Sequence, residues 1–505
     1  MSNSDKQKLL ELMAGIAPQN PTAENESNDD AVFLKNFLPI PNYRQVLERD
    51  TLLILGGKGV GKTELFRLLA IPSGRKILVE NLKIRALDDL DKTTWIAGFG
   101  RTQQQEKTFP APESIESKMH NASNLDWRMF WIGLMLGRIL SQEQVILKSD
   151  WVDEIPLEIR ESLTNKLPLL SAWFPLVCQN IEKINYALDL LDQKLIESDQ
   201  WLFITYDELD RLGSSYHQLA TPIRELLAFW LDRWRRWERI RPKIFLRTDL
   251  FREDFLSFPD ASKLKAYQIN LEWKDSWLYQ LLFKRLANSG QEMAEYLHRI
   301  SPTSPNFLKE TNTPLGIIIT ANEVSHEFVI GRIINRFMGD NPRQGYTHLW
   351  IPNNLKDAGG RIYPRAFLQL FSLPAQRRID ESDLQNLTGD TLLTPADLQS
   401  ALVDISKYRI RELVDEYPWL EPLKKSLNGL KVPVAEEIFL DKLKNTIWSE
   451  ESGKQPPTLT PEEIMQYLLQ LGIIDRRSDK RVNMPTIYMY GFGVKRPGGV
   501  KRPKR

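Results

Sequence analysis

The stretch TLLILGGKGVGKTELF, residues 51–66, decides the fold. Its apolar run from Leu52 to Leu55 is short and compatible with a β-strand, and leucines recur at helical spacing after Lys62. The glycine-rich segment between these two parts therefore joins a strand to a helix. The pattern predicts a strand, a tight loop and a helix in direct succession.

This loop has the sequence G-x-x-x-x-G-K-[ST], in which backbone N–H groups and a helix N-terminus surround the phosphates of a nucleotide. Lys62 would reach the β and γ phosphates, and the Thr63 hydroxyl would hold Mg²⁺, so we expect ATP and Mg²⁺ as ligands. A glycine-rich turn with an exposed lysine is the alternative, but the flanking strand and helix favour the nucleotide site. The residues expected to bind the cofactor are Gly56, Gly57, Lys58, Gly59, Val60, Gly61, Lys62, Thr63 and Glu64.

The composition is that of a soluble globular chain, with 505 residues of which 42% are hydrophobic and 26% charged. This length predicts about three domains. The longest apolar stretch, residues 129–140, contains Arg138 and is too short to span a bilayer, and the N-terminus lacks a signal-peptide pattern. We therefore expect a cytoplasmic protein with no membrane partner. The single cysteine, Cys178, excludes an intrachain disulfide, and no zinc motif is found among the dispersed histidines.

The net charge of +1 conceals an asymmetry along the chain. Residues 476–505 carry ten Lys and Arg against one Asp, a net of +9, which leaves −8 for the preceding 475 residues. The basic charge is thus concentrated at the C-terminal end.

The second diagnostic segment is WLFITYDELDRLG, residues 201–213. Trp201 to Tyr206 form a continuous apolar run, as expected for a central strand of a parallel sheet, and Asp207 and Glu208 follow at its carboxyl end, where ligands bind in such sheets. Asp207 would complete the Mg²⁺ site, and Glu208 would polarise a water for attack on the γ-phosphate. An acidic pair of purely structural role is the alternative.

The third segment is PKIFLRTDLF, residues 242–251, which predicts another buried strand. Arg247 and Thr248 follow this strand and could contact the γ-phosphate or neutralise charge that develops in the transition state. An ordinary ion pair at a strand end is the alternative. Further strands are expected at KILVENL, residues 76–82, and AYQINLEW, residues 266–273, with an exposed loop at 95–122.

The order of GGKGVGKT, FITYDELDRL, IFLRTDLF and INLEWKDSWLYQLLFKRL resembles the AAA-related P-loop ATPases of the STAND and KAP type. It is particularly similar to a bacterial branch with DELDRL and FLRTD signatures, whose relatives are nucleotide-driven switches, many of them in defence against phage and plasmids. The resemblance implies an α/β P-loop NTPase core with a parallel sheet, in which an additional strand lies between the Walker A and Walker B strands. It also implies Glu208 as catalytic base and a helical lid after the core.

The chain departs from this group in two ways. The spacing of 145 positions from Lys62 to Asp207 exceeds what a compact core needs, so a helical insertion is expected near residues 83–185. The second departure is that no repeat of 20 to 50 residues follows the ATPase, unlike in many STAND sensors.

Past residue 290 the pattern is mostly helical. In GGRIYPRAFLQLF, Pro364 occupies the first position of a helix and Arg365 follows, which suits a lid helix that presents an arginine to bound nucleotide, similar to the second sensor of AAA-type lids. A surface arginine at a helix start is the alternative. Thr394 and Asp397 predict the capped start of a long helix.

The end of the chain predicts a winged helix. A helix begins near Thr460 and stops at Gly472, and IIDRRSDKRVNMPTIYMYGFG, residues 473–493, then predicts two strands around a polar turn. Basic residues interleave with aromatic residues in this region, as is typical of proteins that bind a nucleic-acid backbone. A solvated tail on a domain that packs against the lid or a neighbouring subunit is the alternative.

These patterns together predict an ATP-hydrolysing switch that forms a homo-oligomer and couples its nucleotide state to an effector protein encoded nearby or to nucleic acid in a defence system. A DNA-binding loader of the replication or transposition class and a P-loop small-molecule kinase are the alternatives, and the kinase is disfavoured because the acidic pair favours water as nucleophile. The expected domains are a disordered segment at 1–30, apart from a short helix at 5–14, an ATPase core at 31–290, a helical lid at 291–430, a winged-helix-like domain at 431–492 and a basic tail at 493–505.

Overall fold

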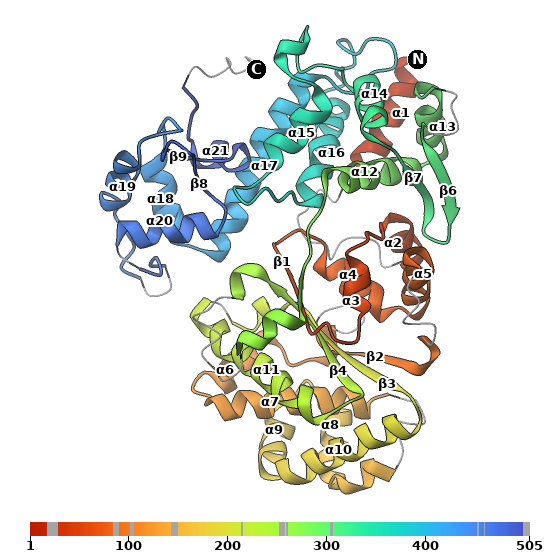
Figure 1. The fold of residues 1–505 in the computed structure, drawn as a ribbon, viewed down its shortest axis with the longest axis vertical. Helices are drawn as coiled ribbons and strands as arrows, with labels where there is room; N and C mark the ends of the chain where they lie inside the picture. Colours follow the sequence, from red (N-terminus) through yellow and green to blue (C-terminus); the bar gives the residue numbers. More distant parts are fainter. Residues whose placement is uncertain are drawn as a thin grey trace. The chain divides into compact units, whose positions relative to one another are not determined.

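The computed structural model divides the chain into two compact units, which are described separately (Figure 1). One unit comprises Pro39–Leu271, and the other combines Met1–Leu38 with Glu272–Arg505. The structure describes residues 1–17, 29–83, 90–100, 106–142, 150–213, 216–251, 258, 261–302, 307–451, 454–458 and 460–497.

The first unit is built on a five-stranded parallel sheet with the order β2-β3-β4-β1-β5. Its strands are β1 (Leu53–Gly56), β2 (Thr93–Phe99), β3 (Trp201–Tyr206), β4 (Ile240–Arg247) and β5 (Gln268–Asn270). Every residue of β1 is buried, as its continuous apolar run predicts. Strand β4 separates the P-loop strand β1 from the acidic strand β3, so the additional strand is confirmed. The fold is an α/β P-loop NTPase core with a parallel sheet.

Two expectations for this unit were wrong. Residues 76–82 belong to helix α5 (Pro72–Leu82), because Pro72 sets the first turn of a helix whose buried side chains include Leu78 and Leu82, four residues apart. The expected exposed loop at 95–122 contains most of β2 and helix α6 (Pro112–Met119), while residues 101–105 lie outside the described part. The remaining helices of the core are α3 (Tyr43–Leu47), α4 (Lys62–Ala70) and α11 (Tyr216–Arg236).

A helical segment follows β2 and returns the chain to β3. Helix α7 packs against β2, α8, α9 and α11, and the buried rings of Trp131 and Trp173 lie in its core. A Cβ atom on Gly133 would come within 2.2 Å of the Trp173 ring, so this glycine permits the close approach of α7 to α9. The helices that follow α6 are α7 (Asn124–Leu140), α8 (Leu157–Asn165), α9 (Leu170–Gln179) and α10 (Ile181–Glu197).

The second unit begins with an ordered helix, α1 (Asn3–Ala14), whose Ser2 and Asp5 form a capping box. Its buried face, which includes Leu10 and Met13, packs against α16 (Pro364–Asp380), and α1 covers the short helix expected at 5–14. Residues 18–28 lie outside the described part. The other elements up to the long lid helices are α2 (Asp30–Asn36), α12 (Asp275–Ser289), α13 (Gln291–Ile300), β6 (Lys309–Thr313), β7 (Gly316–Thr320), α14 (Glu323–Ile333) and α15 (Thr347–Leu355).

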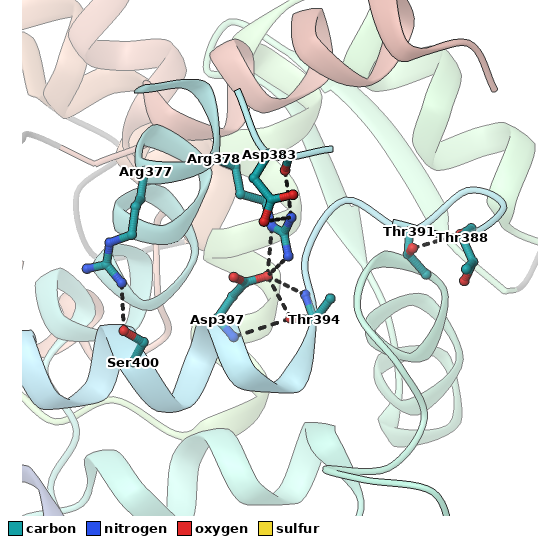
Figure 2. Close-up of polar contacts among 8 residues, drawn as sticks. All are labelled: Arg377, Arg378, Asp383, Thr388, Thr391, Thr394, Asp397 and Ser400. Atoms are coloured by element: carbon teal, nitrogen blue, oxygen red, sulfur yellow. Dashed lines mark hydrogen bonds and ion pairs between the residues drawn. The ribbon is translucent and has the colours of Figure 1, made fainter. Parts of the chain in front are cut away.

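Two long helices, α16 (Pro364–Asp380) and α17 (Pro395–Glu416), form the centre of this unit. Figure 2 shows how the start of α17 is held: the Thr394 backbone N–H and hydroxyl donate to Asp397, and the same carboxylate accepts two hydrogen bonds from Arg378 of α16. The capping box expected at Thr394 and Asp397 is confirmed. The Arg378 guanidinium is 6% exposed, so this ion pair fixes α17 to α16 from a largely buried position.

The C-terminal part has the outline of a winged helix. Helices α18 (Leu420–Leu427), α19 (Glu436–Lys444) and α20 (Pro461–Gln470) precede the antiparallel pair β8 (Asp475–Arg476) and β9 (Val482–Asn483). Val434, between α18 and α19, pairs with Val482 and adds a third chain segment to this pair. The order of helices and strands therefore matches the expectation of a winged-helix-like domain.

The second predicted strand of this domain is much shorter than expected. Residues 486–492 form helix α21 (Thr486–Phe492), which packs on α17 with Tyr488 and Phe492 each 1% exposed. Burial of these rings overrides the strand preference of the aromatic residues. Tyr488 and Phe492 therefore cannot stack on nucleic-acid bases. Residues 498–505 of the expected basic tail lie outside the described part.

Among the described residues, none of the helices combines the length and the apolar character that crossing a bilayer requires.

Candidate functional site

The P-loop connects β1 to α4 within the first unit. Gly59 and Gly61 adopt φ values of 85° and 98°, a left-handed region that favours glycine. A Cβ atom on Gly56 would come within 2.5 Å of the Val60 side chain. The glycines are thus required for the tight path of the loop, which ends as Gly61 caps the N-terminus of α4.

Lys62 points back into this loop. Its Nζ atom donates to the carbonyl oxygens of Gly56 at 2.9 Å and Gly57 at 3.1 Å, and the residue is only 9% exposed. Burial lowers the pKa of the ammonium, and the nearby Asp207 carboxylate opposes that shift. The lysine therefore lies inside the loop as a partly desolvated cation, which strengthens its attraction to an anion.

Asp207 follows β3 directly and is 2% exposed. Its backbone N–H donates to Phe99 of β2 at 3.0 Å, which fixes the position of the side chain. Burial raises the pKa of this carboxyl to about 6, against the opposing effects of Lys62, the Glu208 backbone and a side-chain hydrogen bond with Thr63. The Thr63 hydroxyl and the Asp207 carboxylate thus meet beside the Lys62 ammonium.

One oxygen of this carboxylate, Oδ2, is buried without a hydrogen-bond partner among the described residues. A buried oxygen without a partner costs free energy, and a cation would satisfy it. Mg²⁺ is usually held by one or two protein oxygens together with waters and substrate phosphates. The Asp207 and Thr63 oxygens fit that donor set, whereas the described ranges contain no cluster of three or more His, Cys, Asp or Glu that could hold a metal without such added ligands.

Glu208 adopts a left-handed backbone conformation with φ 56°, which is uncommon for a residue with a side chain. Its carboxylate is 11% exposed and lies 3.5 Å from the Arg211 guanidinium. Such strained positions cluster at functional sites and need support from the surrounding structure. The preceding buried strand and the 3₁₀ turn Leu209–Arg211 supply that support.

Arg247 is the last residue of β4 and is paired in register with Gly56 of β1. Its guanidinium makes two hydrogen bonds to Asp249, the shorter at 2.6 Å, and lies 3.3 Å from Asp210. Arg247, Asp210 and Asp249 all influence the pKa of Lys62, so these charges surround the P-loop lysine. Thr248 begins the short 3₁₀ helix Thr248–Leu250.

Three residues near the P-loop were missed in the sequence. Asp210 and Asp249 each follow a predicted site residue by two positions, in DELD and RTD, and this repeated spacing of acids could have revealed them. Tyr43, the first residue of α3, is 2% exposed, and its hydroxyl lies 3.8 Å from where a Cβ atom on Gly61 would be. Burial raises its pKa, with a further contribution from Glu64. The sequence around Tyr43 contains no pattern that would predict its position beside the P-loop.

Arg365 belongs to the second unit, where it is the second residue of α16. Pro364 occupies the first position, as expected. The Arg365 guanidinium lies 3.1 Å from Glu412 of α17, and Glu412 also accepts from Arg409 at 3.3 Å. The predicted site residues from Gly56 to Arg247 therefore lie in one unit, and Arg365 lies in the other.

No family model and no curated protein matches this sequence. Similar solved structures include the ORC2 protein of Aeropyrum pernix in ADPNP and ADP complexes, at 12% identity with a TM-score of 0.29, covering 94% of this chain and 96% of that one. The ORC1 protein of Aeropyrum pernix in complex with DNA matches at 13% identity with a TM-score of 0.32, over 90% and 91% of the two chains. Cdc6p from Pyrobaculum aerophilum matches at 13% identity with a TM-score of 0.26, over 93% of each chain.

These TM-scores are all below 0.5, so the matches assign no residue role and no function to this chain. The strand order and the P-loop carry the assignment of its fold.

Proposed function

We propose that this protein binds ATP with Mg²⁺ and hydrolyses it, as a nucleotide-driven switch. The observation that carries this proposal is the meeting of Thr63, Asp207 and Lys62 at the carboxyl ends of β1 and β3. A cation, a carboxylate and a hydroxyl at the N-terminus of a helix are the groups that an Mg²⁺-bound triphosphate needs.

Each residue has a distinct role in the proposed reaction. The backbone N–H groups of residues 57–63 bind the phosphate oxygens, and Lys62 leaves the Gly56 and Gly57 carbonyls to bind the β and γ phosphates. Asp207 and Thr63 would hold Mg²⁺, and the charge that the ion supplies would offset the charge that develops on the phosphates. Glu208 accepts a proton from the attacking water, and Arg247 and Thr248 bind the γ-phosphate.

Hydrolysis is favoured over transfer to a small molecule. Glu208 directly follows the proposed metal ligand, and its strained backbone is held by the end of a buried strand. A carboxylate held in this position suits the activation of water. This function explains the strain, whereas a P-loop kinase would not require a glutamate there.

The switch is proposed to act on nucleic acid through the C-terminal domain. The observation in favour is the pair of exposed cations on the β8–β9 turn, Arg477 and Lys480. A loader of the DNA-binding class is the matching biological role, with oligomerisation on ATP. A defence switch that acts on an effector encoded nearby is supported by the sequence resemblance alone.

The reaction is tested by phosphate release from ATP with Mg²⁺ and with a chelator. Wild-type protein should release phosphate only with Mg²⁺, and Glu208→Gln should reduce turnover by a factor of about 100 or more. Glu238→Gln is the matched control, since Glu238 is a 62% exposed glutamate in the same unit. Equal turnover in Glu208→Gln and wild type would contradict the assignment of the catalytic base.

A further inference from the structure

The strongest unassigned surface is a small sheet in the C-terminal domain. It consists of β8, β9, residues 430–434 and residues 494–496. Val434 exchanges two backbone hydrogen bonds with Val482, at 2.8 and 2.9 Å. Val432 and Lys495 extend the sheet through hydrogen bonds to Lys495 and Leu430, at 2.9 and 2.8 Å. Four chain segments therefore form one continuous backbone ladder, which we call the wing sheet.

The wing sheet and its turn carry a dense set of exposed cations. Arg476 is neutralised by Glu436 at 2.8 Å, and Arg481 by Asp479 at 2.6 Å. Among the described residues, the other cations of the sheet form no ion pair within 4.0 Å, although Asp479 lies close enough to interact with Arg477, and Asp475 with Arg496. These cations are Lys431, Arg477, Lys480, Lys495 and Arg496.

These charges are close to one another. The backbones of Lys431 and Lys495 are paired as neighbours across the sheet. Arg477 lies close enough to Arg496 to contribute to the lowering of its pKa, after the larger effect of burial. The turn that carries Arg477 and Lys480 is closed by the hydrogen bond from Lys480 N–H to the Arg477 carbonyl, at 2.9 Å. Like charges held together on a rigid backbone repel one another, and a polyanion would relieve that repulsion.

The helix before the wing has the opposite character. In helix-turn-helix proteins the recognition helix lies in the major groove, and α20 occupies the corresponding position in this chain. Its exposed residues are Glu462, Glu463, Gln466 and Gln470. Because this face presents two carboxylates and no cation, phosphates that flank a groove would repel it.

The aromatic residues of this region help to decide between a single-stranded and a double-stranded ligand. Single-stranded nucleic acid is usually bound by bases stacked on exposed aromatic rings. Tyr488 and Phe492 are each 1% exposed in α21 and cannot act as such rings, which leaves Tyr490, a partly buried ring close to Arg496. One partly buried ring does not form the series of stacking platforms that a single strand uses, so the exposed cations favour phosphates, which a duplex presents on a regular surface.

We propose that the wing sheet binds the phosphate backbone of double-stranded nucleic acid without reading its sequence, while α20 stays outside the groove. This inference rests on the proposed action of the protein on nucleic acid. It adds to that proposal that the wing sheet is the surface that binds, that the ligand is a duplex, and that the contacts are made to phosphates rather than to bases.

The test uses full-length protein and a fluorescent DNA duplex of arbitrary sequence, with anisotropy measured across a salt series. Arg477→Glu with Lys495→Glu should weaken binding and flatten the slope of log affinity against log salt by up to about 1.8, since each lost phosphate contact contributes about 0.9. The matched control is Lys425→Glu with Lys444→Glu, which makes the same change in charge at exposed lysines of α18 and α19. This control should leave the slope unchanged.

A third variant, Gln466→Ala with Gln470→Ala, removes polar groups from the exposed face of α20 and should bind the duplex as wild type does. Loss of binding in this variant would overturn the wing-sheet mode in favour of readout by α20. Equal loss in the wing-sheet variant and in its charge-matched control would also overturn it. If wild-type protein hydrolyses ATP but binds no duplex at low salt, the proposed action on nucleic acid fails while the ATPase assignment stands. Binding to vesicles of anionic lipid without binding to the duplex would overturn both the ligand class and that action.

Discussion

Gly56 and Arg247 are paired in register at the carboxyl ends of the adjacent strands β1 and β4. This pairing places the arginine beside the first glycine of the P-loop, with its guanidinium held by Asp249 and Asp210. Two acids keep the cation fixed near the proposed γ-phosphate position. A fixed cation stabilises charge in the transition state without reorganisation.

Arg247→Ala should therefore reduce the turnover number by a factor of about 100, with ATP affinity changed only a few-fold. Steady-state kinetics with Mg²⁺ measure both quantities. Arg236→Ala is the control, because Arg236 pairs with Asp189 from a 51% exposed position in the same unit. Unchanged turnover in Arg247→Ala would assign this arginine to a structural ion pair.

Arg365 carries a separate prediction for the lid. If Arg365 binds the γ-phosphate, Arg365→Ala should reduce the preference for ATP over ADP, because a cation that contacts only the triphosphate is lost. The ratio of the dissociation constants for ATP and ADP measures this preference. Arg377→Ala is a suitable control, since Arg377 lies at the other end of α16 and pairs with Asp404. The same ratio in wild type and Arg365→Ala would leave Arg365 only its ion pair with Glu412.

The burial of Lys243 predicts that the free energy of unfolding depends on pH. This lysine lies on β4 with no exposure, donates to the carbonyl oxygens of Glu48 and Thr51, and has its pKa lowered by burial to about 7. The unfolded chain keeps this proton up to about pH 10, whereas the folded chain loses it above about pH 7. The unfolded state therefore binds more protons in this window, and the free energy of unfolding rises with pH by at most about 1.4 kcal/mol per unit.

Lys243→Met removes this contribution. The difference in the free energy of unfolding between wild type and the variant should shift in favour of wild type as the pH rises from about 7 to about 10. Denaturant titrations at several pH values measure it, and Lys284, whose pKa is also lowered to about 7, is present in both proteins. A difference that stays constant with pH would show that Lys243 keeps its proton in the folded protein throughout.

The central strands could be predicted because burial on both faces gives them continuous apolar sequences. Strands β3 and β4 are almost entirely buried, and their acidic and basic ends follow directly from the sequence. Strand β2 lies at the edge of the sheet, and its first three residues are only partly buried. Its sequence TTWIAGF therefore lacks a continuous apolar run, and the pattern indicates a loop where the structure has a strand.

The other errors arise from tertiary packing. Helix α21 contains residues that favour strands, but its close contact with α17 decides its conformation: a Cβ atom on Gly491 would come within 2.2 Å of Ile410. Tyr43 reaches the P-loop only because the chain before β1 folds back as α3, with Lys243 at the end of that helix. No local pattern in the sequence records such long-range contacts.

The central claim is tested most directly by calorimetric titration of ATP with Mg²⁺ into wild type, Lys62→Ala and Glu208→Gln. Lys62→Ala should weaken ATP binding by a factor of about 10 to 100 or more, because the phosphates lose a charged hydrogen-bond donor. Glu208→Gln should bind ATP within about threefold of wild type, since this residue acts on water rather than on the phosphates. Equal ATP affinity in wild type and Lys62→Ala would contradict the assignment of residues 56–64 as the nucleotide site.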